Sequence, residues 1–455
     1  MTISFGETFE RVKECFKEPS IVSELVPKLQ SVTIIRDVNG KIRLFLDLSE
    51  GQKLQNVTDL DNLLSEKLRH YYGNDIWLPA GKNDPYKALI DTIKAERDFA
   101  SWDDESVLPR WYILERHIAK QAWTDKNVGE PPWKQELVDQ GHKPAIVSFF
   151  SFKGGVGRTS TLVATALTLA RNGHRVAIVD LDLEAPGLAT IFSSDNSSNP
   201  GVIDYLLENN IKGNDWKLRT HLINISEQKL LGDDGQPIQL LSAGTVDKDY
   251  LEKLARLDFQ NLVNGELRST MQDMLKELES EAKPLDFILM DARAGFHDIG
   301  GLAIANLSHA AVIFGTQSRQ SWAGLTHVIR HLASPGLDER LPLILVHSMA
   351  PALGILGREQ ELTEFREQAY IIFQDNYYAE DETVPNPTDT EEPFTPFVIP
   401  YQESLRGDIA LFPRNSTLEE LNRLSDLAKI MTNDPYPAIA EKLCEIFGRN
   451  FEKSR

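Results

Sequence analysis

Residues 145–160 have the sequence AIVSFFSFKGGVGRTS, and this stretch decides the fold of the larger part of the chain. Its apolar start, 145–150, predicts a buried strand, and the spacing of apolar residues over 159–172 predicts a helix. A glycine-rich turn between a strand and a helix lets backbone N–H groups surround phosphate oxygens at the positive end of the helix. The stretch therefore predicts a phosphate-binding loop in a nucleotide-binding protein.

The side chains that close this loop are suited to phosphate and metal chemistry. Thr159 stands where a hydroxyl joins a Mg²⁺ shell, and Ser160 can reach the inner phosphates. The general G-x-x-x-x-G-K-[ST] pattern is altered twice, because Phe152 replaces its first glycine and Arg158 replaces its lysine. We expect the nucleotide to contact the whole loop, namely Lys153, Gly154, Gly155, Val156, Gly157, Arg158, Thr159 and Ser160.

Composition limits the class of protein. The 455 residues have an ordinary apolar content of 41% and a formal charge of −20, which opposes general attraction to nucleic acid or to an anionic membrane. The chain has no run of about 20 apolar residues and no N-terminal segment of the signal-peptide type. Its two cysteines, Cys15 and Cys444, cannot form a disulfide framework. A cytoplasmic protein is expected.

Two further strands are predicted to end in carboxylates. The strand 175–181 runs into VDLDLEAPGL, which places Asp180 and Asp182 at the carboxyl edge of the sheet. The sequence FILMDARAG, residues 287–295, places Asp291 at the end of another apolar strand, where it can hold Mg²⁺ through water. Carboxylates at these positions would lie beside the phosphates.

Periodicity divides the chain into an N-terminal α+β module, 1–125, a linker, 126–143, and a nucleotide-binding domain, 144–455. In the last part, strands alternate with helices, which predicts an α/β fold with a mostly parallel sheet between layers of helices. In the first part we expect a helix over 12–29, a hairpin turning at Asn39-Gly40 and an apolar-striped docking helix over 110–123. The remaining predicted strands are 239–241, 286–290, 310–316, 343–347 and 397–399.

The loop KGGVGRTS resembles the deviant Walker A motif, KGGxGK[ST], of the ParA/MinD ATPases and nitrogenase iron protein, which belong to the SIMIBI class of P-loop proteins. It is most similar to a subgroup in which arginine replaces the second lysine, the KGGVGR type. The resemblance covers Pro144 to about Ile430. It implies ATP and Mg²⁺ as ligands and a sandwich homodimer, in which Lys153 would reach the nucleotide of the other subunit.

The resemblance also implies roles for the acidic residues. Asp182 would position the attacking water, and Asp180 would lie close to the metal. Asp291 would hold Mg²⁺ through water, and Gly295 would bring a backbone N–H to the γ-phosphate. Arg293 stands where proline is common, and it would sense the γ-phosphate, contact the other subunit of the dimer, or form a structural ion pair. Arg158 should still contact the β- and γ-phosphates, although its planar group is no conservative substitute for lysine.

Contacts to the base are implied by two segments near the C-terminus. FVIPY, 397–401, is similar to the strand whose proline, here Pro400, lies beside the base. The usual base-reading asparagine is replaced by His347 and Ser348 in LILVHSM, so adenine follows from the family alone. The helix expected over 437–449 places Ile439 and Leu443 on one apolar face, and its acidic residues favour packing in the core over binding to a membrane.

Two functions remain open at this stage. The first is an ATPase whose nucleotide state controls dimerisation and the binding of a separate effector protein, in a bacterial defence or stress-signalling system. The second is a nucleotide sensor that does not hydrolyse ATP because Arg158 has replaced the lysine. A partition or positioning role of the ParA/MinD kind is the alternative setting.

Overall fold

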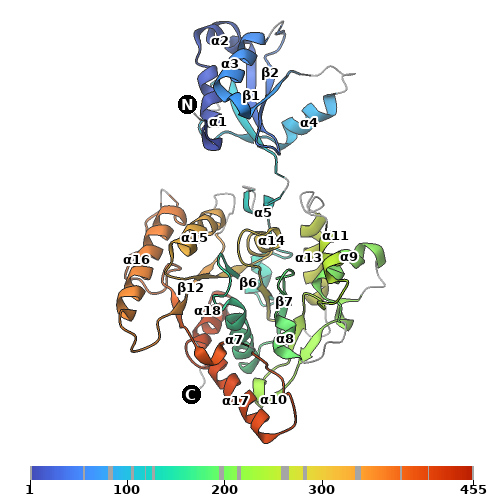
Figure 1. Ribbon diagram of the computed structural model, residues 1–455, viewed down its shortest axis with the longest axis vertical. Helices are drawn as coiled ribbons and strands as arrows, with labels where there is room; N and C mark the ends of the chain where they lie inside the picture. The colour runs from blue at the N-terminus through green and yellow to red at the C-terminus, as the bar shows by residue number, and fades with distance from the viewer. Residues whose placement is uncertain are drawn as a thin grey trace. The chain divides into compact units, whose positions relative to one another are not determined.

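The chain forms two compact units in the computed structural model, Met1–Ile118 and Ala119–Arg455 (Figure 1). The structure describes residues 3–54, 57–79, 86–103, 107–117, 119–124, 129–193, 199–212, 217–257, 266–279, 284–333, 340–379, 382–407 and 409–452.

The smaller unit is built on a mixed five-stranded sheet with the order β3-β2-β1-β5-β4. The predicted hairpin is confirmed, because β1 and β2 pair antiparallel across a turn in which Gly40 has a φ of +77°. Apolar residues of β1 and β2 pack with those of α1 and α3 in one core. The elements are α1 Thr8–Cys15, α2 Pro19–Glu24, β1 Leu29–Arg36, β2 Ile42–Leu48, α3 Thr58–Leu68, β3 Tyr72–Trp77, α4 Lys87–Glu96, β4 Asp98–Phe99 and β5 Arg110–Glu115.

Two helix predictions for this unit were wrong. The helix expected over 12–29 is divided at Pro19, which begins α2, and Leu29 already belongs to β1. The docking helix expected over 110–123 is instead the strand β5 followed by the short helix α5, Gln121–Thr124. The aromatic residues Trp111 and Tyr112 occur in strands as readily as in helices, and here β5 pairs parallel with β1.

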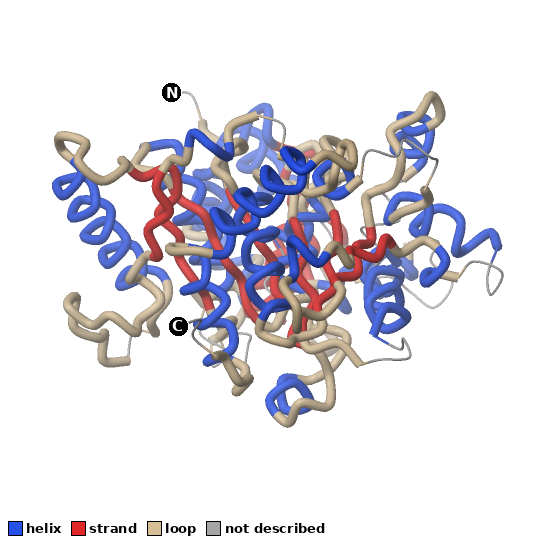
Figure 2. The backbone as a smooth tube through the Cα atoms, turned by 90° about the horizontal axis from the view of Figure 1, so that it is seen from below, coloured by secondary structure: helices blue, strands red, loops and turns tan. Residues whose placement is uncertain are grey.

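The larger unit contains an eight-stranded sheet with the order β13-β12-β11-β6-β10-β7-β9-β8, and it confirms the predicted parallel α/β fold. Only the β8–β9 pair among these described strands is antiparallel. The central strands are buried throughout, as expected for a sheet covered on both faces (Figure 2). The strands are β6 Ala145–Ser151, β7 Val176–Asp180, β8 Ile223–Ile225, β9 Ile238–Leu241, β10 Phe287–Asp291, β11 Ala310–Gly315, β12 Leu343–Ala350 and β13 Phe397–Pro400.

The connections between strands place the site. From β6 the chain crosses through α7 to β7 on one side of β10, whereas from β10 it crosses through α14 to β11 in the opposite direction. Because such crossovers are right-handed, α7 and α14 lie on opposite faces of the sheet. The direction of winding thus reverses between β6 and β10, and ligands of open α/β sheets bind at the carboxyl ends of strands at such a point.

Helices complete both layers around this sheet. α17 and α18 pack with α7, and Ile439 and Leu443 of α18 are buried together with Phe447 directly after it, which confirms the expected core packing of the last helix. No helix in the described ranges is long and apolar enough to span a bilayer. The helices are α6 Gln135–Asp139, α7 Arg158–Arg171, α8 Leu188–Phe192, α9 Val202–Lys212, α10 Gln228–Leu231, α11 Tyr250–Arg256, α13 Glu266–Glu279, α14 Asp298–Asn306, α15 Arg319–Leu332, α16 Arg358–Asn376, α17 Leu418–Thr432 and α18 Tyr436–Ile446.

The segment predicted as a linker, 126–143, is packed into the larger unit where it is described. Trp133 and Val138 are buried in its core, and the Trp133 indole N–H donates to the Pro144 carbonyl at 2.9 Å. The glycines and prolines that break the periodicity here therefore belong to an irregular segment packed on the core of the larger unit. The division between the two units falls earlier, at Ala119.

Candidate functional site

The predicted phosphate loop follows the buried strand β6 and ends where α7 begins at Arg158. Gly155 and Gly157 adopt φ angles of +73° and +77°, which disfavour any residue with a Cβ atom. Gly154 and Gly155 are exposed, and apart from the adjoining residues no described atom lies within 4 Å of a Cβ built on either. The loop therefore leaves its backbone open to a ligand at the N-terminal end of a 14-residue helix.

Phe152 explains how the chain dispenses with the first glycine of the general motif. The Phe152 ring lies against Gly324 of α15, where a Cβ would come within 2.0 Å of the ring, and 5.0 Å from the ring of Phe296. Glycine at position 324 supplies the space that the bulky loop residue needs. Packing therefore accommodates Phe152. The second departure from the motif, Arg158, is accommodated by charged partners.

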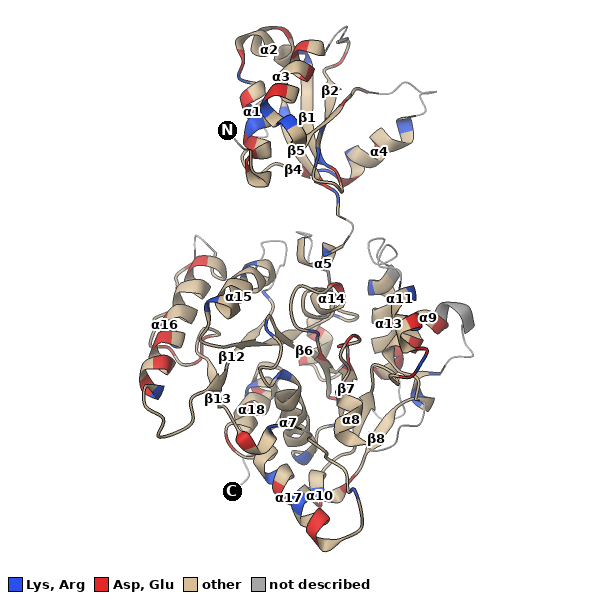
Figure 3. Ribbon diagram, viewed as in Figure 1, with Lys and Arg blue, Asp and Glu red and all other residues tan. Residues whose placement is uncertain are grey.

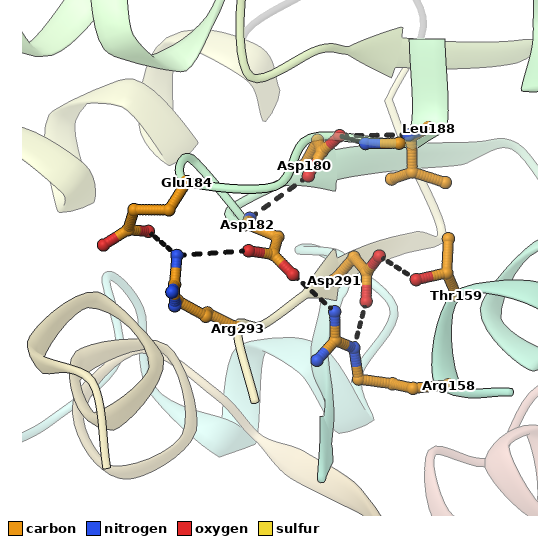
Figure 4. A network of polar contacts seen from close by, with 9 residues as sticks. Arg158, Thr159, Asp180, Asp182, Glu184, Leu188, Asp291 and Arg293 are labelled. Atoms are coloured by element: carbon orange, nitrogen blue, oxygen red, sulfur yellow. Dashed lines mark hydrogen bonds and ion pairs between the residues drawn. The ribbon is translucent and has the colours of Figure 1, made fainter. Parts of the chain in front are cut away.

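Arg158 points into a group of carboxylates (Figure 4). Its Nε donates to Asp291 Oδ1 at 2.5 Å, and its Nη2 donates to Asp182 Oδ2 at 3.1 Å, with only 8% of the side chain exposed. Burial alone would lower the pKa of Arg158, but the charges of Asp291 and Asp182 outweigh burial and raise it. Arg158 is therefore a permanently charged side chain that links two carboxylates, Asp291 at the end of β10 and Asp182 just after β7.

Thr159 and Asp291 form the second contact of the group. The Thr159 hydroxyl donates to Asp291 Oδ2 at 2.6 Å, so the two oxygens of Asp291 are shared between Arg158 and Thr159. Burial raises the pKa of Asp291, while Arg158 and the hydroxyl act in the opposite direction. Hydroxyl and carboxylate oxygens are the ligands that Mg²⁺ prefers, and the structure brings together two of the three residues predicted for it.

Asp180 lies near these residues but its carboxylate binds the backbone. Its Oδ1 accepts from the N–H of Asp182, and its Oδ2 accepts from the N–H groups of Gly187 and Leu188, at 3.1–3.2 Å. Burial, with the nearby charge of Asp291, raises the pKa of Asp180 to about 7. In this arrangement Asp180 holds the turn 181–188 in place, and Asp182 is the carboxylate of that turn that faces Arg158.

A second charged cluster lies at the outer side of Asp182. Arg293 Nη1 is 2.5 Å from Glu184 Oε2 and 3.7 Å from Asp182 Oδ1, and His297 Nδ1 is 3.4 Å from Glu184 Oε1. Of the roles open for Arg293, the structure contains the ion pair. Sequence analysis missed Glu184, although the alternating acids in VDLDLE were a signal. The ribbon of the turn after β7 is red where its acidic residues lie (Figure 3).

Other predicted residues are placed as follows. Lys153 is exposed on the loop, and within the described ranges its amine has no hydrogen bond or ion pair. Gly295 has a φ of +81°, and its N–H donates to Ser151 O at 3.0 Å, so in this structure the group predicted for the γ-phosphate is bound to the loop strand.

The predicted base contacts differ in exposure. His347 is fully buried and stacks on Phe365 at 3.9 Å, and burial lowers its pKa to about 4. A buried neutral imidazole presents no edge to a ligand in this structure, so the prediction for His347 finds no support in the geometry. Pro400 is half-buried at the end of β13, opposite Ala350 of β12, at the expected sheet edge.

Comparison with known proteins shows a family match in the larger unit, which contains the phosphate loop. Residues 143–242, which include the loop and the turn after β7, match a family model described as ParA, NUBPL iron-transfer P-loop NTPase. The chain contains a ParA-family P-loop NTPase domain. The matched residues begin just before β6, so the family assignment rests on the strand, the loop and the acidic turn described above.

The relatives of this ParA-family domain include proteins named for iron–sulfur clusters. The chain is 30% identical over 166 residues to the cytosolic Fe-S cluster assembly factor CFD1 of Candida albicans, covering 34% of the chain and 48% of that protein. It is 27% identical over 164 residues to an iron-sulfur cluster carrier protein of Pseudomonas fragi, covering 33% of the chain and 53% of that protein. The chain thus spans about half the length of these relatives.

Among solved structures, the septum site-determining protein MinD with Mg-ADP from Pyrococcus horikoshii is similar to 67% of this chain. The similarity covers 98% of MinD, with 19% identity and a TM-score of 0.41.

Proposed function

We propose that the ParA-family domain binds ATP with Mg²⁺, hydrolyses it, and uses the bound nucleotide as a switch that controls partner binding. The observation that supports this most is the convergence of Arg158, Thr159, Asp182 and Asp291 beside the open backbone of the loop. Cation, hydroxyl and two carboxylates at the N-terminal end of a helix match what phosphoryl transfer needs, which is positioning and charge stabilisation.

The oxygen donors present fit a magnesium ion. Thr159 and Asp291 would hold it, directly and through water, and Mg²⁺ would neutralise charge on the phosphates. Within the described part of the chain, no group of three His, Cys, Asp or Glu side chains forms a metal cage. This is consistent with magnesium, since in such sites phosphates and water supply most of its ligands.

The residues of the chain then take distinct roles. Arg158 is poised to exchange the carboxylates of Asp291 and Asp182 for phosphate oxygens, since the guanidinium binds either anion. The released Asp182 carboxylate can accept a hydrogen bond from water and orient it for attack. Because each group changes partner, binding of the nucleotide and rearrangement of the carboxylates are coupled.

Lys153 supports the proposal that two copies form a sandwich around the nucleotide. It is exposed on the loop, while Arg158, the other cation of the motif, is occupied within its own subunit. An exposed amine at this position is free to reach a phosphate of a facing copy. A homodimer would present a new surface to a separate effector protein. The defence or stress-signalling setting and the cytoplasmic location stay predictions.

A nucleotide sensor without hydrolysis is the second candidate, and the contacts of Arg158 favour it. The guanidinium binds both carboxylates, and Asp182 cannot orient water while Arg158 holds it. If these pairs persist with ATP bound, the site would bind without turnover.

A role in carrying iron–sulfur clusters, which the names of the relatives suggest, does not fit the residues of this chain. Clusters are held by cysteine thiolates, and the chain has two cysteines, Cys15 and Cys444, in different units. Both are buried, and burial raises their pKa values to about 11 and about 12. Neither thiol is available as a thiolate at a shared surface site.

Phosphate release from ATP and Mg²⁺ tests the proposal. The full chain is expected to release phosphate, and Asp182→Ala to lower the rate at least about 100-fold while leaving ATP affinity within about 3-fold. Asp249→Ala, at an exposed acid outside the site, is the control and should keep the wild-type rate. Bound ATP recovered intact from the wild type would favour the sensor, and absence of ATP binding would refute both functions.

A further inference from the structure

The segment Ala119–Thr124, which we call the strap, directly follows the N-terminal unit in the chain and packs on α14. Its Trp123 indole N–H donates to the His297 carbonyl at 2.7 Å. The Trp123 ring lies 5.2 Å from that of Phe296 and 5.3 Å from that of Phe150. The strap thus binds the residues that immediately precede α14.

Space for this contact is built into α14. A Cβ at Gly301 would come within 2.7 Å of Trp123 Nε1 and within 3.0 Å of Ala122 Cβ, so any larger residue would displace the strap. Lys120 holds the strap at a second point, because its backbone N–H donates to Asp298 and its amine is 3.3 Å from Asp298 Oδ2. Both ends of the strap are therefore fixed to residues 297–301.

The same short segment contacts the proposed nucleotide site on its other side. Arg293 pairs with Glu184 and approaches Asp182, and His297 also approaches Glu184. Between them, Gly295 donates to Ser151 at the end of β6. Residues 293–298 thus run from the carboxylates of the site to the strap within six positions.

We propose that Trp123 is a positioning residue for nucleotide hydrolysis, acting through the segment Arg293–Asp298. The proposal rests on the proposed ATPase function and deepens it. Trp123 holds the His297 carbonyl, which fixes the backbone that carries Arg293 and its partners next to Asp182. If the contacts of Trp123 affect nucleotide binding at Asp182, then nucleotide binding must also affect the contacts of the strap, because a coupling free energy between two sites is reciprocal.

Trp123→Phe tests this with little change in packing, since the ring remains and the N–H donor is lost. Loss of one hydrogen bond of this kind corresponds to a factor of about 2 to 10. We expect kcat to fall by that factor, KM for ATP to stay within about 2-fold, and amide exchange of residues 293–301 to speed up. Nucleotide should in turn change exchange of the strap in the wild type.

Trp133→Phe is the matched control. Trp133 also donates its indole N–H to a backbone carbonyl in the same unit, that of Pro144, and its ring stacks on His309. It should lower thermal stability about as much as Trp123→Phe and leave kcat and the exchange of 293–301 unchanged.

Several results would overturn the proposal. These are unchanged kcat and unchanged exchange of 293–301 in Trp123→Phe, an equal loss of kcat in Trp133→Phe, or faster exchange spread uniformly over β6 and α7. If the wild type releases no phosphate, the ATPase function fails by itself. The exchange measurements with bound ATP then decide alone whether Trp123 positions the segment.

Discussion

Replacing Arg158 by methionine removes the buried cation that joins Asp291 and Asp182. The guanidinium is 8% exposed and hydrogen-bonded to both carboxylates, so the variant leaves buried acids without their main partner. Breaking a buried ion pair from one side costs about 3–5 kcal/mol, which corresponds to a fall in Tm of about 4–7 °C for a unit of this size.

The loss of stability in Arg158→Met should increase as the pH rises. Burial already raises the pKa of Asp291, and Arg158 is the main influence that lowers it. Without Arg158 the native carboxyl holds its proton to a higher pH than the unfolded one, so unfolding free energy is lost as pH rises. The Tm deficit of Arg158→Met should therefore be larger at pH 8 than at pH 5.5.

A double-mutant cycle with Asp291→Asn measures the pair itself. Thermal melts of the full chain, of both single variants and of the double variant should give a coupling free energy of at least about 1 kcal/mol. Arg171→Met is the matched control, because Arg171 lies at the other end of α7, about 20 Å away along the helix. Its effect should add to that of Asp291→Asn. Additive effects of Arg158→Met and Asp291→Asn would refute the reasoning.

Three further predictions concern packing, protonation and the thiols. Gly324→Ala should cost about 1–3 kcal/mol of unfolding free energy because the new methyl group meets the Phe152 ring, and adding Phe152→Ala should restore part of it in thermal melts; no restoration would contradict this packing. His309 is buried with a pKa lowered by burial to about 4, so below pH 6.5 the unfolded chain takes up a proton that the native imidazole refuses. Between pH 6.5 and 4 this group should lower the free energy of unfolding by up to about 1.4 kcal/mol per pH unit, and Tm should fall with it. His309→Gln should flatten the slope of Tm against pH; an unchanged slope would show that the group does not contribute. Cys15 and Cys444 should resist alkylation in the native protein, and anaerobic incubation with ferrous iron and sulfide should give no cluster chromophore; a stable chromophore would reopen the carrier role.

The strand, loop and helix around Lys153–Ser160 could be predicted because their pattern is local. Apolar strands, a glycine-rich turn and a helical spacing each follow from residues that are neighbours in sequence. The same holds for the carboxylates at the ends of β7 and β10, whose position at one sheet edge follows from parallel pairing. Fold class and the candidate site therefore came from short-range signals.

The partners of these residues could not be predicted in the same way. Whether Arg158 meets phosphate or carboxylate depends on where three strand ends lie in space. Whether 126–143 is a linker depends on contacts between Trp133 and residues that are distant in sequence, such as His309. The helix prediction for 110–123 was wrong for a related reason. Its aromatic residues suit a strand or a helix, and the pairing of β5 with β1 makes this segment a strand.

Sedimentation velocity of the full chain with and without ATP and Mg²⁺ tests most directly the claim that nucleotide completes the site across two copies. The wild type should change from monomer to dimer when ATP and Mg²⁺ are added. Lys153→Ala should bind ATP yet stay monomeric, while the control Lys134→Ala, at another exposed lysine, should dimerise normally. Equal mass with and without nucleotide, or full dimerisation of Lys153→Ala, would contradict the account.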